Sequence, residues 1–434
     1  MNSKGIAIIV AALAIPLLWF IPLAAQNNST AIYSQYLGSA SLILMGITML
    51  LATRIKIIEP IFGSLDRVYV LHKWLGVGAI ATAYLHSTID AEVNGVALVP
   101  RFADAAEEWG ELAYNGLLFL IILSLITIIP YKLWKWSHRL IGLFFALAAA
   151  HYIYIEKPFA VFEPLGLYIS LFCFIGVASY LYLLLPRILG INNKKYKVTE
   201  VVQHSDVAEI KLRPEGNAIK HKAGQFAFVN FEPVNMMETH PFTISSAPKP
   251  DGELSFRVKS LGSYTKRMGT ALKPGMTARV SNPFGHFSLQ SSKGPQVWIG
   301  AGIGITPFIA WAESLPADWP SPTTLYYCVP SRDKALYLTE FESIAAAVPN
   351  FNLILVVSGE DKRLSADRIA ANLGTELKAA DVYFCGPTQM RESLKSGLRT
   401  KGLGRSNFHY EEFEMRTGLG IMNWFRWFKR FLGI

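Results

Sequence analysis

The fold is decided by two apolar stretches, LHKWLGVGAIATAYLH (71–86) and SHRLIGLFFALAAAH (137–151). Each carries one histidine near either end, namely His72 and His86 in the first and His138 and His151 in the second. At roughly 1.5 Å of rise per residue, the two histidines of one helix are about 20 Å apart, which is most of a hydrocarbon core of about 30 Å. We therefore expect two membrane helices, each with a histidine near both membrane faces.

Histidines inside a membrane span are costly and usually functional, and neutral imidazole is an axial ligand of haem iron. If the helices face each other, His72 lies opposite His138, and His86 opposite His151, which makes two bis-histidine haem sites. The alternative is four buried histidines that bond to neighbouring helices. Fourteen residues return His86 to within about 40° of His72, but thirteen leave His151 about 140° from His138. The second helix therefore needs an irregular turn, or its haems approach from different sides.

Composition separates a membrane half from a soluble half. The 434 residues are 51% hydrophobic and 17% charged, and the apolar residues concentrate in the first 187 positions. Six membrane spans are predicted, each near the twenty or so residues that a span needs, at 6–25, 31–53, 67–90, 111–130, 137–155 and 165–186. The first is interpreted as a retained helix and not a cleaved signal.

The loops between these spans differ in the sign of their charge. One set is basic and contains Lys4, Arg54, Lys56, Arg67, Lys132, Lys135, Arg139 and Arg187. The other set is acidic, with Asp90, Glu92, Asp104, Glu107, Glu108, Glu156 and Glu163 against Arg101 and Lys157. The positive-inside rule then places both termini and the soluble half in the cytoplasm. It also accounts for the net charge of +9.

Two classes of function are excluded by what the sequence does not contain. No basic-aromatic module indicates nucleic-acid binding. The three cysteines are too scattered for a disulfide framework or a zinc site; they are Cys173, Cys328 and Cys385.

The soluble half begins after a polar linker and divides in two. Short alternating runs separated by glycine and proline, from 196 to about 290, predict an antiparallel β-barrel. From 296 onward, apolar strands alternate with helical segments, which predicts a parallel α/β sheet. We therefore expect domains at 1–190, 191–292 and 293–415, followed by a tail at 416–434.

Two segments of the expected barrel suit a flavin. In HPFTISSAP (240–248), an apolar ring and a hydroxyl could face the flavin, and a histidine could lie near its phosphates. GSYT (262–265) offers a glycine turn and a hydroxyl for a pyrophosphate. The alternatives are an ordinary strand start and an ordinary turn. The candidate flavin-binding residues are His240, Pro241, Phe242, Thr243, Ser246, Gly262, Tyr264 and Thr265.

Three segments of the expected α/β sheet suit a nicotinamide nucleotide. GAGIGITP (300–307) follows a strand and leads into a helix, so its backbone could approach phosphate. FCGP (384–387) follows the last sheet strand, and an arginine after the second strand could read a 2′-phosphate, unless it is an ordinary exposed loop arginine. The candidate residues are Gly300, Gly302, Gly304, Thr306, Pro307, Ser331, Arg332, Cys385, Gly386 and Pro387.

In this order along one chain, these motifs resemble the NADPH oxidase and ferric reductase superfamily, and the likeness is to its compact bacterial members. The two histidine spacings are similar to that family's haem-ligand spacings, with Phe144 as the aromatic residue between the haems. HPFT is similar to its FAD motif, GAGIGITP to its nucleotide glycine turn and CGP to its nicotinamide-side motif. EEF (411–413) resembles the segment that lays an aromatic ring, here Phe413, over the flavin.

The resemblance implies a six-helix membrane haem bundle joined to a ferredoxin-reductase-like unit, in the inner cell membrane with the FAD and NADPH domains in the cytoplasm. It implies FAD, two haems b and NADPH as cofactors and donor. The catalytic candidates are Thr243, Cys385 and Phe413. The acceptor outside would be O2, giving superoxide, or a ferric chelate, or an extracytoplasmic protein. No obligatory protein subunit is indicated.

The tail at 416–434, RTGLGIMNWFRWFKRFLGI, has no counterpart in that likeness. Its apolar residues recur at three- and four-residue steps, and the remaining face is basic. Such a helix is typical of the membrane interface. Packing against the NADPH domain is the alternative.

Overall fold

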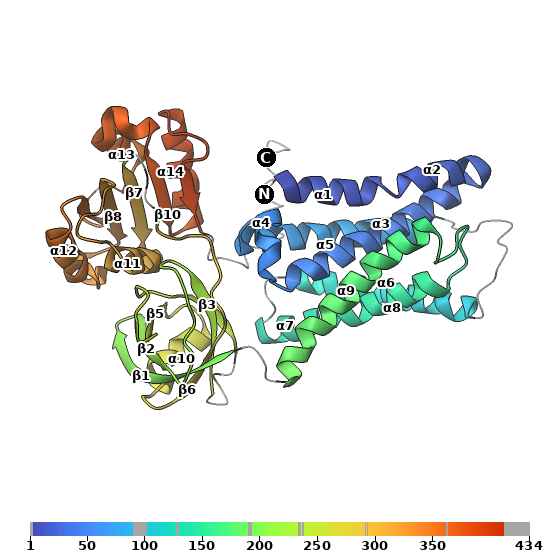
Figure 1. Cartoon of the computed structure of the whole chain (residues 1–434), viewed down its shortest axis with the longest axis horizontal. Coiled ribbons are helices and arrows are strands. Elements are labelled where there is room, and N and C mark those ends of the chain that lie inside the picture. Colours follow the sequence, from blue (N-terminus) through green and yellow to red (C-terminus); the bar gives the residue numbers. More distant parts are fainter. Residues whose placement is uncertain are drawn as a thin grey trace. The chain divides into compact units, whose positions relative to one another are not determined.

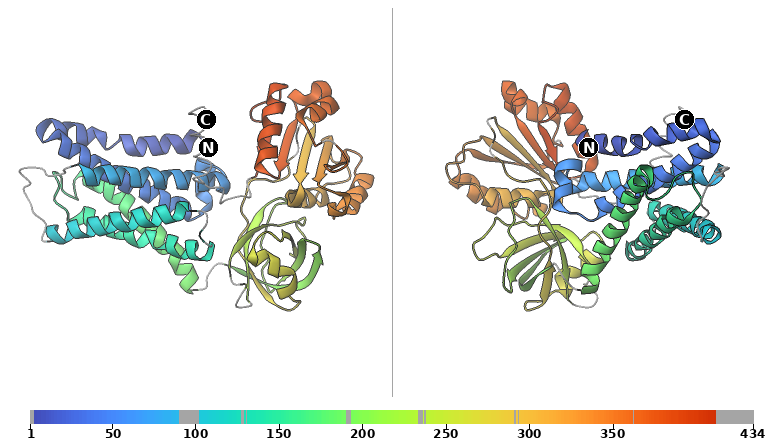
Figure 2. Two further views of the ribbon diagram at one scale, coloured as in Figure 1. Left: turned by 180° about the vertical axis from the view of Figure 1, so that it is seen from behind. Right: turned by 45° about the vertical axis from the view of Figure 1, so that its right-hand side comes forward.

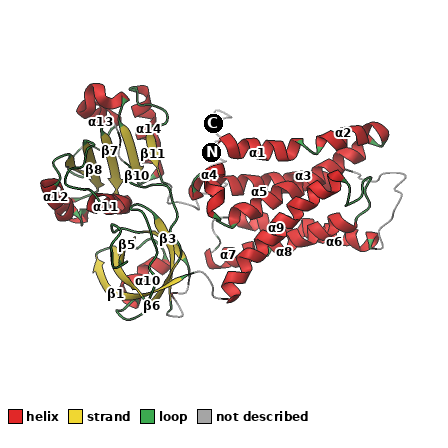
Figure 3. Ribbon diagram, viewed as in Figure 1, coloured by secondary structure: helices red, strands yellow, loops and turns green. Residues whose placement is uncertain are grey.

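The computed structural model describes residues 3–89, 102–126, 129, 131–189, 193–232, 236, 238–290, 292, 294–361 and 363–411. The chain divides into two compact units, with the boundary between Leu189 and Gly190. Figure 3 shows their different character, since the first unit is helical and the second combines helices with strands.

The first unit is a helical bundle (Figure 1). Its helices are α1 (Ser3–Ala14), α2 (Leu17–Gln26), α3 (Ser29–Ala52), α4 (Glu59–Phe62), α5 (Leu65–Thr88), α6 (Ala103–Leu125), α7 (Tyr131–Arg139), α8 (Ile141–Tyr154) and α9 (Pro164–Leu189). A short 3-10 turn, Lys56–Ile58, precedes α4. The most buried helix is α3, which packs against α5 and α9, whereas α6 packs against α8. Gly46 and Gly176 let α3 and α9 approach closely, because a side chain at either would overlap its neighbours.

Five helical segments among the described residues are long and apolar enough to cross a membrane. They are Ser3–Gln26, Ser29–Ala52, Arg67–Thr88, Ala103–Leu125 and Pro164–Leu185. The predicted count of six is therefore not confirmed. The difference lies at 137–155, where a turn at Leu140 separates α7 from α8. At 9 and 14 residues, α7 and α8 are each shorter than the twenty or so residues that a span needs.

The second unit begins with a six-stranded antiparallel barrel in the order β4-β3-β6-β1-β2-β5. Its strands are β1 (Lys194–His204), β2 (Val207–Pro214), β3 (Phe226–Phe231), β4 (His240–Thr243), β5 (Leu254–Lys259) and β6 (Thr277–Val280). A bridge between Ile244 and Phe256 brings β4 to β5 and closes the barrel. Helix α10 (Ser263–Ala271), the yellow helix beside the green strands in Figure 2 (left), packs against β1, β2 and β5.

A five-stranded parallel sheet follows, in the order β11-β10-β7-β8-β9. Its strands are β7 (Gln296–Ala301), β8 (Thr323–Val329), β9 (Phe351–Val357), β10 (Asp381–Cys385) and β11 (Phe408–Tyr410). One face is covered by α11 (Thr306–Glu313) and α12 (Leu338–Ala347), and the other by α13 (Ala366–Leu373) and α14 (Thr388–Thr400). Short 3-10 turns lie at Gly302–Ile305, Arg332–Lys334 and Gly374–Lys378. Alternation of strands with helices therefore predicted this sheet correctly.

Candidate functional sites

The structure brings two of the four predicted haem histidines close together. His72 on α5 and His138 on α7 have ring centroids 6.0 Å apart, with their planes inclined at 59°. A metal binds imidazole nitrogen at about 2 Å, so two rings on one ion have centroids roughly 6 Å apart. The space between these rings therefore suits one metal ion.

All four histidines use the same ring nitrogen for hydrogen bonding. Nδ1 of His72, His86 and His151 lies 2.9, 3.0 and 2.7 Å from the carbonyl oxygens of Thr48, Ser34 and Ala106, respectively. Nδ1 of His138 lies 2.8 Å from Oγ of Ser124. Within the described residues, no hydrogen bond involves Nε2 of any of the four rings. A histidine held by Nδ1–H offers the Nε2 lone pair to a metal.

Glycines on neighbouring helices lie against His86, His151 and the predicted aromatic residue. A Cβ at Gly38 would lie 3.1 Å from the His86 ring, and one at Gly110 would lie 2.5 Å from Nδ1 of His151. On α6, a Cβ at Gly116 would overlap the ring of Phe144. The rings of His151 and Phe144 therefore occupy space that a side chain at Gly110 or Gly116 would fill, whereas the contact of Gly38 with His86 is tight but not excluded.

The donor set of the bundle fits haem b. It consists of four imidazoles that are each hydrogen-bonded through Nδ1, and in the part of the chain that the structure describes none of their hydrogen bonds involves Nε2. Among the described residues, no group of three or more His, Cys, Asp or Glu side chains could hold another metal ion. Four imidazoles are the number of axial ligands that two six-coordinate haem irons require.

The flavin motif forms β4 and the turn that follows it. Thr243 is buried, whereas Phe242 and His240 remain half-exposed. The His240 ring lies against Tyr264 of α10, with centroids 4.1 Å apart, and its Nε2 is 3.3 Å from a carboxylate oxygen of Glu238. The first and second halves of the predicted flavin site therefore meet at the His240–Tyr264 contact.

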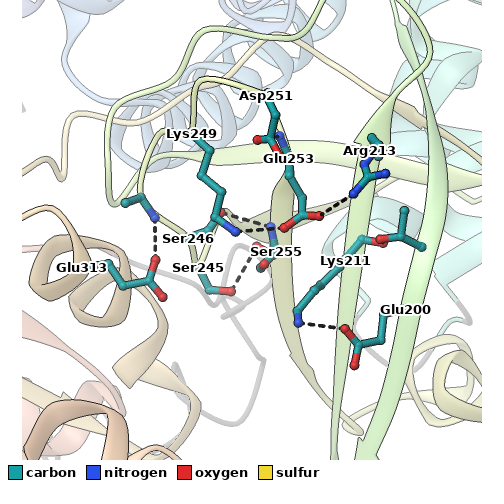
Figure 4. A network of polar contacts seen from close by, with 12 residues as sticks. Glu200, Lys211, Arg213, Ser245, Ser246, Lys249, Asp251, Glu253, Ser255 and Glu313 are labelled. Carbon is teal, nitrogen blue, oxygen red and sulfur yellow. Dashed lines mark hydrogen bonds and ion pairs between the residues drawn. The ribbon is translucent and has the colours of Figure 1, made fainter. Parts of the chain in front are cut away.

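The hydroxyl groups of two predicted flavin ligands already accept hydrogen bonds from backbone amides of nearby residues. Oγ of Ser246 accepts a hydrogen bond from the Ser255 amide at 3.1 Å, deep in the network of Figure 4. Oγ1 of Thr265 accepts from the Gly262 amide at 3.0 Å and caps α10. Both hydroxyls thus build the local structure, and Gly262, which has open space around it, is the residue that leaves room for a ligand.

The nucleotide motifs meet at the carboxyl ends of β7 and β10. Gly304 packs so closely on Cys385 that an added Cβ would overlap the Cys385 carbonyl oxygen. Gly386 is packed against Ala301 in the same way. Gly302 has φ of +57° with open space beside it, so its backbone is exposed where a phosphate would approach. Thr306 and Pro307 begin α11 directly behind this turn.

Cys385 is fully buried at the centre of this arrangement. Burial, together with the nearby carboxylate of Glu411, raises the pKa of its thiol well above the ordinary value of 9.0. The thiol is therefore neutral at physiological pH. Glu411 also faces Gly285 of the barrel, so the terminal segment returns to both halves of the unit. Phe413 lies outside the described residues.

The arginine predicted to read a 2′-phosphate lies at the surface beyond β8. Ser331 precedes the 3-10 turn that carries Arg332, and the Arg332 side chain is 69% exposed. Its Nε lies 3.2 Å from a carboxylate oxygen of Glu360, which follows β9. The predicted cation thus already has an anionic partner.

Sequence reasoning missed the residues that orient the histidines and make room for them. Ser124, Gly38 and Gly110 carry no motif, and small or hydroxyl residues are common in membrane helices. Both glycines are also distant in sequence from the histidines that they accommodate. Only the packing of α3 and α6 against the histidine helices shows their role.

Comparisons with known proteins match three consecutive family models to the chain. Residues 37–149 match a ferric reductase like transmembrane component, 189–294 an FAD-binding domain and 298–396 an oxidoreductase NAD-binding domain. The predicted order of a membrane helical domain and a ferredoxin-reductase-like unit is therefore confirmed.

Individual relatives cover parts of the chain. The electron transfer component of toluate 1,2-dioxygenase from Pseudomonas putida is 28% identical over 207 residues, which are 45% of this chain and 60% of that protein. A heavy chain of the superoxide-generating NADPH oxidase from Dictyostelium discoideum is 30% identical over 192 residues, 40% of this chain and 35% of that protein. The chain thus spans about a third to three fifths of these relatives.

A solved structure extends the likeness in fold. Flavohemoglobin from Malassezia yamatoensis, with bound FAD and heme, aligns with a TM-score of 0.51 at 18% identity. The alignment covers 94% of this chain and 98% of that one. At this identity the likeness concerns the fold alone.

Proposed function

Because the chain belongs to the NADPH oxidase and ferric reductase superfamily, we propose that it carries electrons across a membrane. The donor is cytoplasmic NADPH, the carriers are FAD and two bis-histidine haems, and the acceptor is outside. FAD supplies the conversion of a two-electron donor into one-electron steps, and the haems supply one-electron carriers within the apolar bundle.

One observation carries this proposal, namely the paired placement of His72 and His138 with both Nδ1 atoms bonded. An unligated buried pair of imidazoles would gain more from hydrogen bonds at both nitrogens of each ring. Here each ring has one nitrogen satisfied and its Nε2 left over. The alternative of four structural histidines leaves that shared feature unexplained.

In the soluble unit, different residues would bind the phosphate, the nicotinamide and the flavin. The turn at Gly302 leaves backbone open to phosphate, and Gly304 and Gly386 bring the glycine turn against Cys385. A nicotinamide placed at the Cys385 end of β10 would face the carboxyl edge of the sheet, where such sheets bind nucleotides. The neutral thiol would keep charge away from that position. Half-exposed Phe242 and buried Thr243 of β4 would face the flavin.

We propose O2 as the acceptor. It would be reduced to superoxide at the haem edge, because bis-histidine iron has no open coordination position. The superoxide-generating relative from Dictyostelium discoideum supports this choice. A ferric chelate is the second candidate, favoured by the match to a ferric reductase like component. A protein acceptor outside the membrane is the third.

Purified holoprotein distinguishes these candidates. NADPH-driven reduction of cytochrome c that is abolished by superoxide dismutase is expected for O2. Dismutase-insensitive reduction with fast turnover of ferric citrate would instead identify a reductase. Slow turnover with both O2 and ferric citrate would favour a protein acceptor outside the membrane. A spectrum without a haem Soret band or flavin absorbance would reject electron transfer altogether.

The assignment of the outer haem has its own test. His86→Ala should remove one haem and stop electron export, because one axial ligand is lost. NADPH oxidation by an artificial dye should persist, since the dye takes electrons at the flavin. If the variant retains two haems per chain in a pyridine hemochrome assay, His86 is not a ligand.

A further inference from the structure

The four bundle histidines differ in the chemical nature of their Nδ1 partner. His72 and His151 face backbone carbonyl oxygens only. His86 faces the Ser34 carbonyl at 3.0 Å, and the Ser34 hydroxyl, 3.1 Å away, also contacts the carbonyls of His86 and Ile89. For His138 the partner is the Ser124 hydroxyl alone. It is therefore the one ring among the four that depends on a side chain for its orientation.

The direction of the hydrogen bond between Ser124 and His138 follows from a second contact. Oγ of Ser124 donates its only proton to the Leu120 carbonyl, at 2.7 Å. Its lone pairs are then what His138 meets at 2.8 Å, so Nδ1 must carry the proton. The Nε2 lone pair of His138 is consequently free.

A third residue completes the arrangement from the same helix as the histidine. The Trp134 indole stacks on the His138 ring, with centroids 5.1 Å apart and planes inclined at 17°. Its Nε1–H donates to the Ser124 carbonyl at 3.2 Å. Ser124 on α6 therefore fixes both the histidine and the ring stacked on it, and the plane of His138 has little freedom.

We propose that Ser124 and Trp134 are positioning residues that set the electron affinity of the haem held by His72 and His138. The inference rests on the proposed function, because it needs a haem at that pair. A partner that accepts from Nδ1–H raises the basicity of the imidazole and fixes its tautomer. More electron density at Nε2 favours the ferric state, so loss of the hydroxyl should raise that haem's midpoint potential. The other haem, oriented by backbone carbonyls, should not change.

Spectroelectrochemical titration of the purified holoprotein tests this directly, because it resolves two midpoint potentials. Ser124→Ala should shift one midpoint upward and leave the other in place, whereas Ser124→Thr, which keeps a hydroxyl, should restore the wild-type value. Trp134→Phe keeps the stacked ring but loses the indole donor, and should cause a smaller shift of the same midpoint. Ser137→Ala is the matched control, since that hydroxyl bonds to the Trp134 carbonyl and to no histidine.

Different outcomes would contradict the positioning role of Ser124 and the proposed electron-transfer function. Two wild-type midpoints in Ser124→Ala with both haems present, or equal shifts in both, would overturn it. If Ser124→Ala lost one haem, the positioning role would stand only if Ser124→Thr retained it, and would fail if both variants lost it. A wild-type protein without haem would reject the proposed function instead.

Discussion

At the scale of single residues, the ion pair between Arg332 and Glu360 makes nucleotide choice a competition. A 2′-phosphate must displace the Glu360 carboxylate from Arg332, whereas the ribose hydroxyls of NADH can donate to that carboxylate. Both side chains are more than half exposed, so solvent weakens the pair. We therefore expect only a modest preference for NADPH in the natural protein.

Replacing Arg332 should weaken the preference for NADPH, and replacing Glu360 should strengthen it. Arg332→Ala removes a charged hydrogen bond to phosphate, worth about 1.5–3 kcal/mol, and exposure places the effect near the lower figure. The KM for NADPH should rise about tenfold and that for NADH should hardly change. Glu360→Gln should lower the KM for NADPH. Steady-state kinetics with both nucleotides measures this.

The control for these variants is Arg399→Ala, which removes an exposed arginine from α14 of the same domain. It should leave both Michaelis constants unchanged. Equal effects of Arg332→Ala on NADPH and NADH would show that Arg332 does not read the 2′-phosphate.

Gly110 gives a second residue-scale prediction. Gly110→Ala would place a methyl group 2.5 Å from Nδ1 of His151, inside van der Waals contact, so the ring must leave its present position. We expect one of the two haems to be lost, measured by pyridine hemochrome. Gly78→Ala is the matched control, because its Cβ would meet Leu44 at an ordinary 3.6 Å. Full haem content in Gly110→Ala would contradict the outer site.

At the scale of elements, one buried arginine joins the barrel to the nucleotide sheet. Arg257 of β5 has a side chain only 5% exposed, and its Nη2 lies 3.4 Å from Glu209 of β2 and 3.3 Å from Glu340 of α12. Its Nη1 donates to the Ser245 carbonyl at 3.1 Å, and its guanidinium lies 4.5 Å above the Tyr337 ring. The flavin motif and α12 are therefore held by one side chain.

Removing this arginine should destabilise the soluble unit. Breaking a buried pair leaves an uncompensated carboxylate and costs about 3–5 kcal/mol. For a unit of this size, Arg257→Ala should lower the melting temperature on the order of 10 °C. Arg279→Ala breaks the exposed pair with Glu232 and should cost under about 1 kcal/mol. Equal melting temperatures of Arg257→Ala and Arg279→Ala would contradict a stabilising role of the buried Arg257 network.

The elements also show where sequence reasoning succeeds. The thirteen-residue spacing of His138 and His151 predicted either an irregular turn in the second helix or haems that approach it from different sides, and the helix is interrupted at Leu140. Period-2 alternation predicted the barrel, because β2 and β6 are buried mainly on one face, although β3 and β5 are buried on both. The segment 137–155 was predicted as one span, because its apolarity does not show where the helix is interrupted.

The candidate site was less predictable than the fold, for a physical reason. Motifs report which chemistry a backbone segment can offer, as GAGIGITP does for phosphate. They do not report which hydroxyl the local fold already uses, as Ser246 and Thr265 show. Nor do they report acceptors such as the Ala106 carbonyl, because every residue has a carbonyl.

At the scale of the whole molecule, the tail at 416–434 lies outside the described residues, and its role is a prediction from sequence. We propose that it rests on the membrane interface beneath the bundle and keeps the soluble unit near it. Deleting residues 418–434 should leave haem and FAD content intact but slow electron transfer from FAD to haem, measured by stopped-flow absorbance. An unchanged rate would argue against tethering.

The tail itself can be tested as a peptide. A 416–434 peptide should bind vesicles of anionic lipid at low salt and become helical, because basic residues approach the headgroups while Trp424 and Phe428 enter the acyl boundary. A peptide with Trp424 and Phe428 replaced by serine is the control and should bind more weakly. Absence of binding at low salt would favour packing against the NADPH domain.

The hydrogen bonds at Nδ1 also bear on how such a protein is made. Three of the four rings are oriented by main-chain carbonyls that exist as soon as α3 and α6 are folded and packed. Because these acceptors belong to the backbone, we expect bundle assembly to precede haem delivery. Expression without a haem supply should then yield folded apoprotein that binds haem added later.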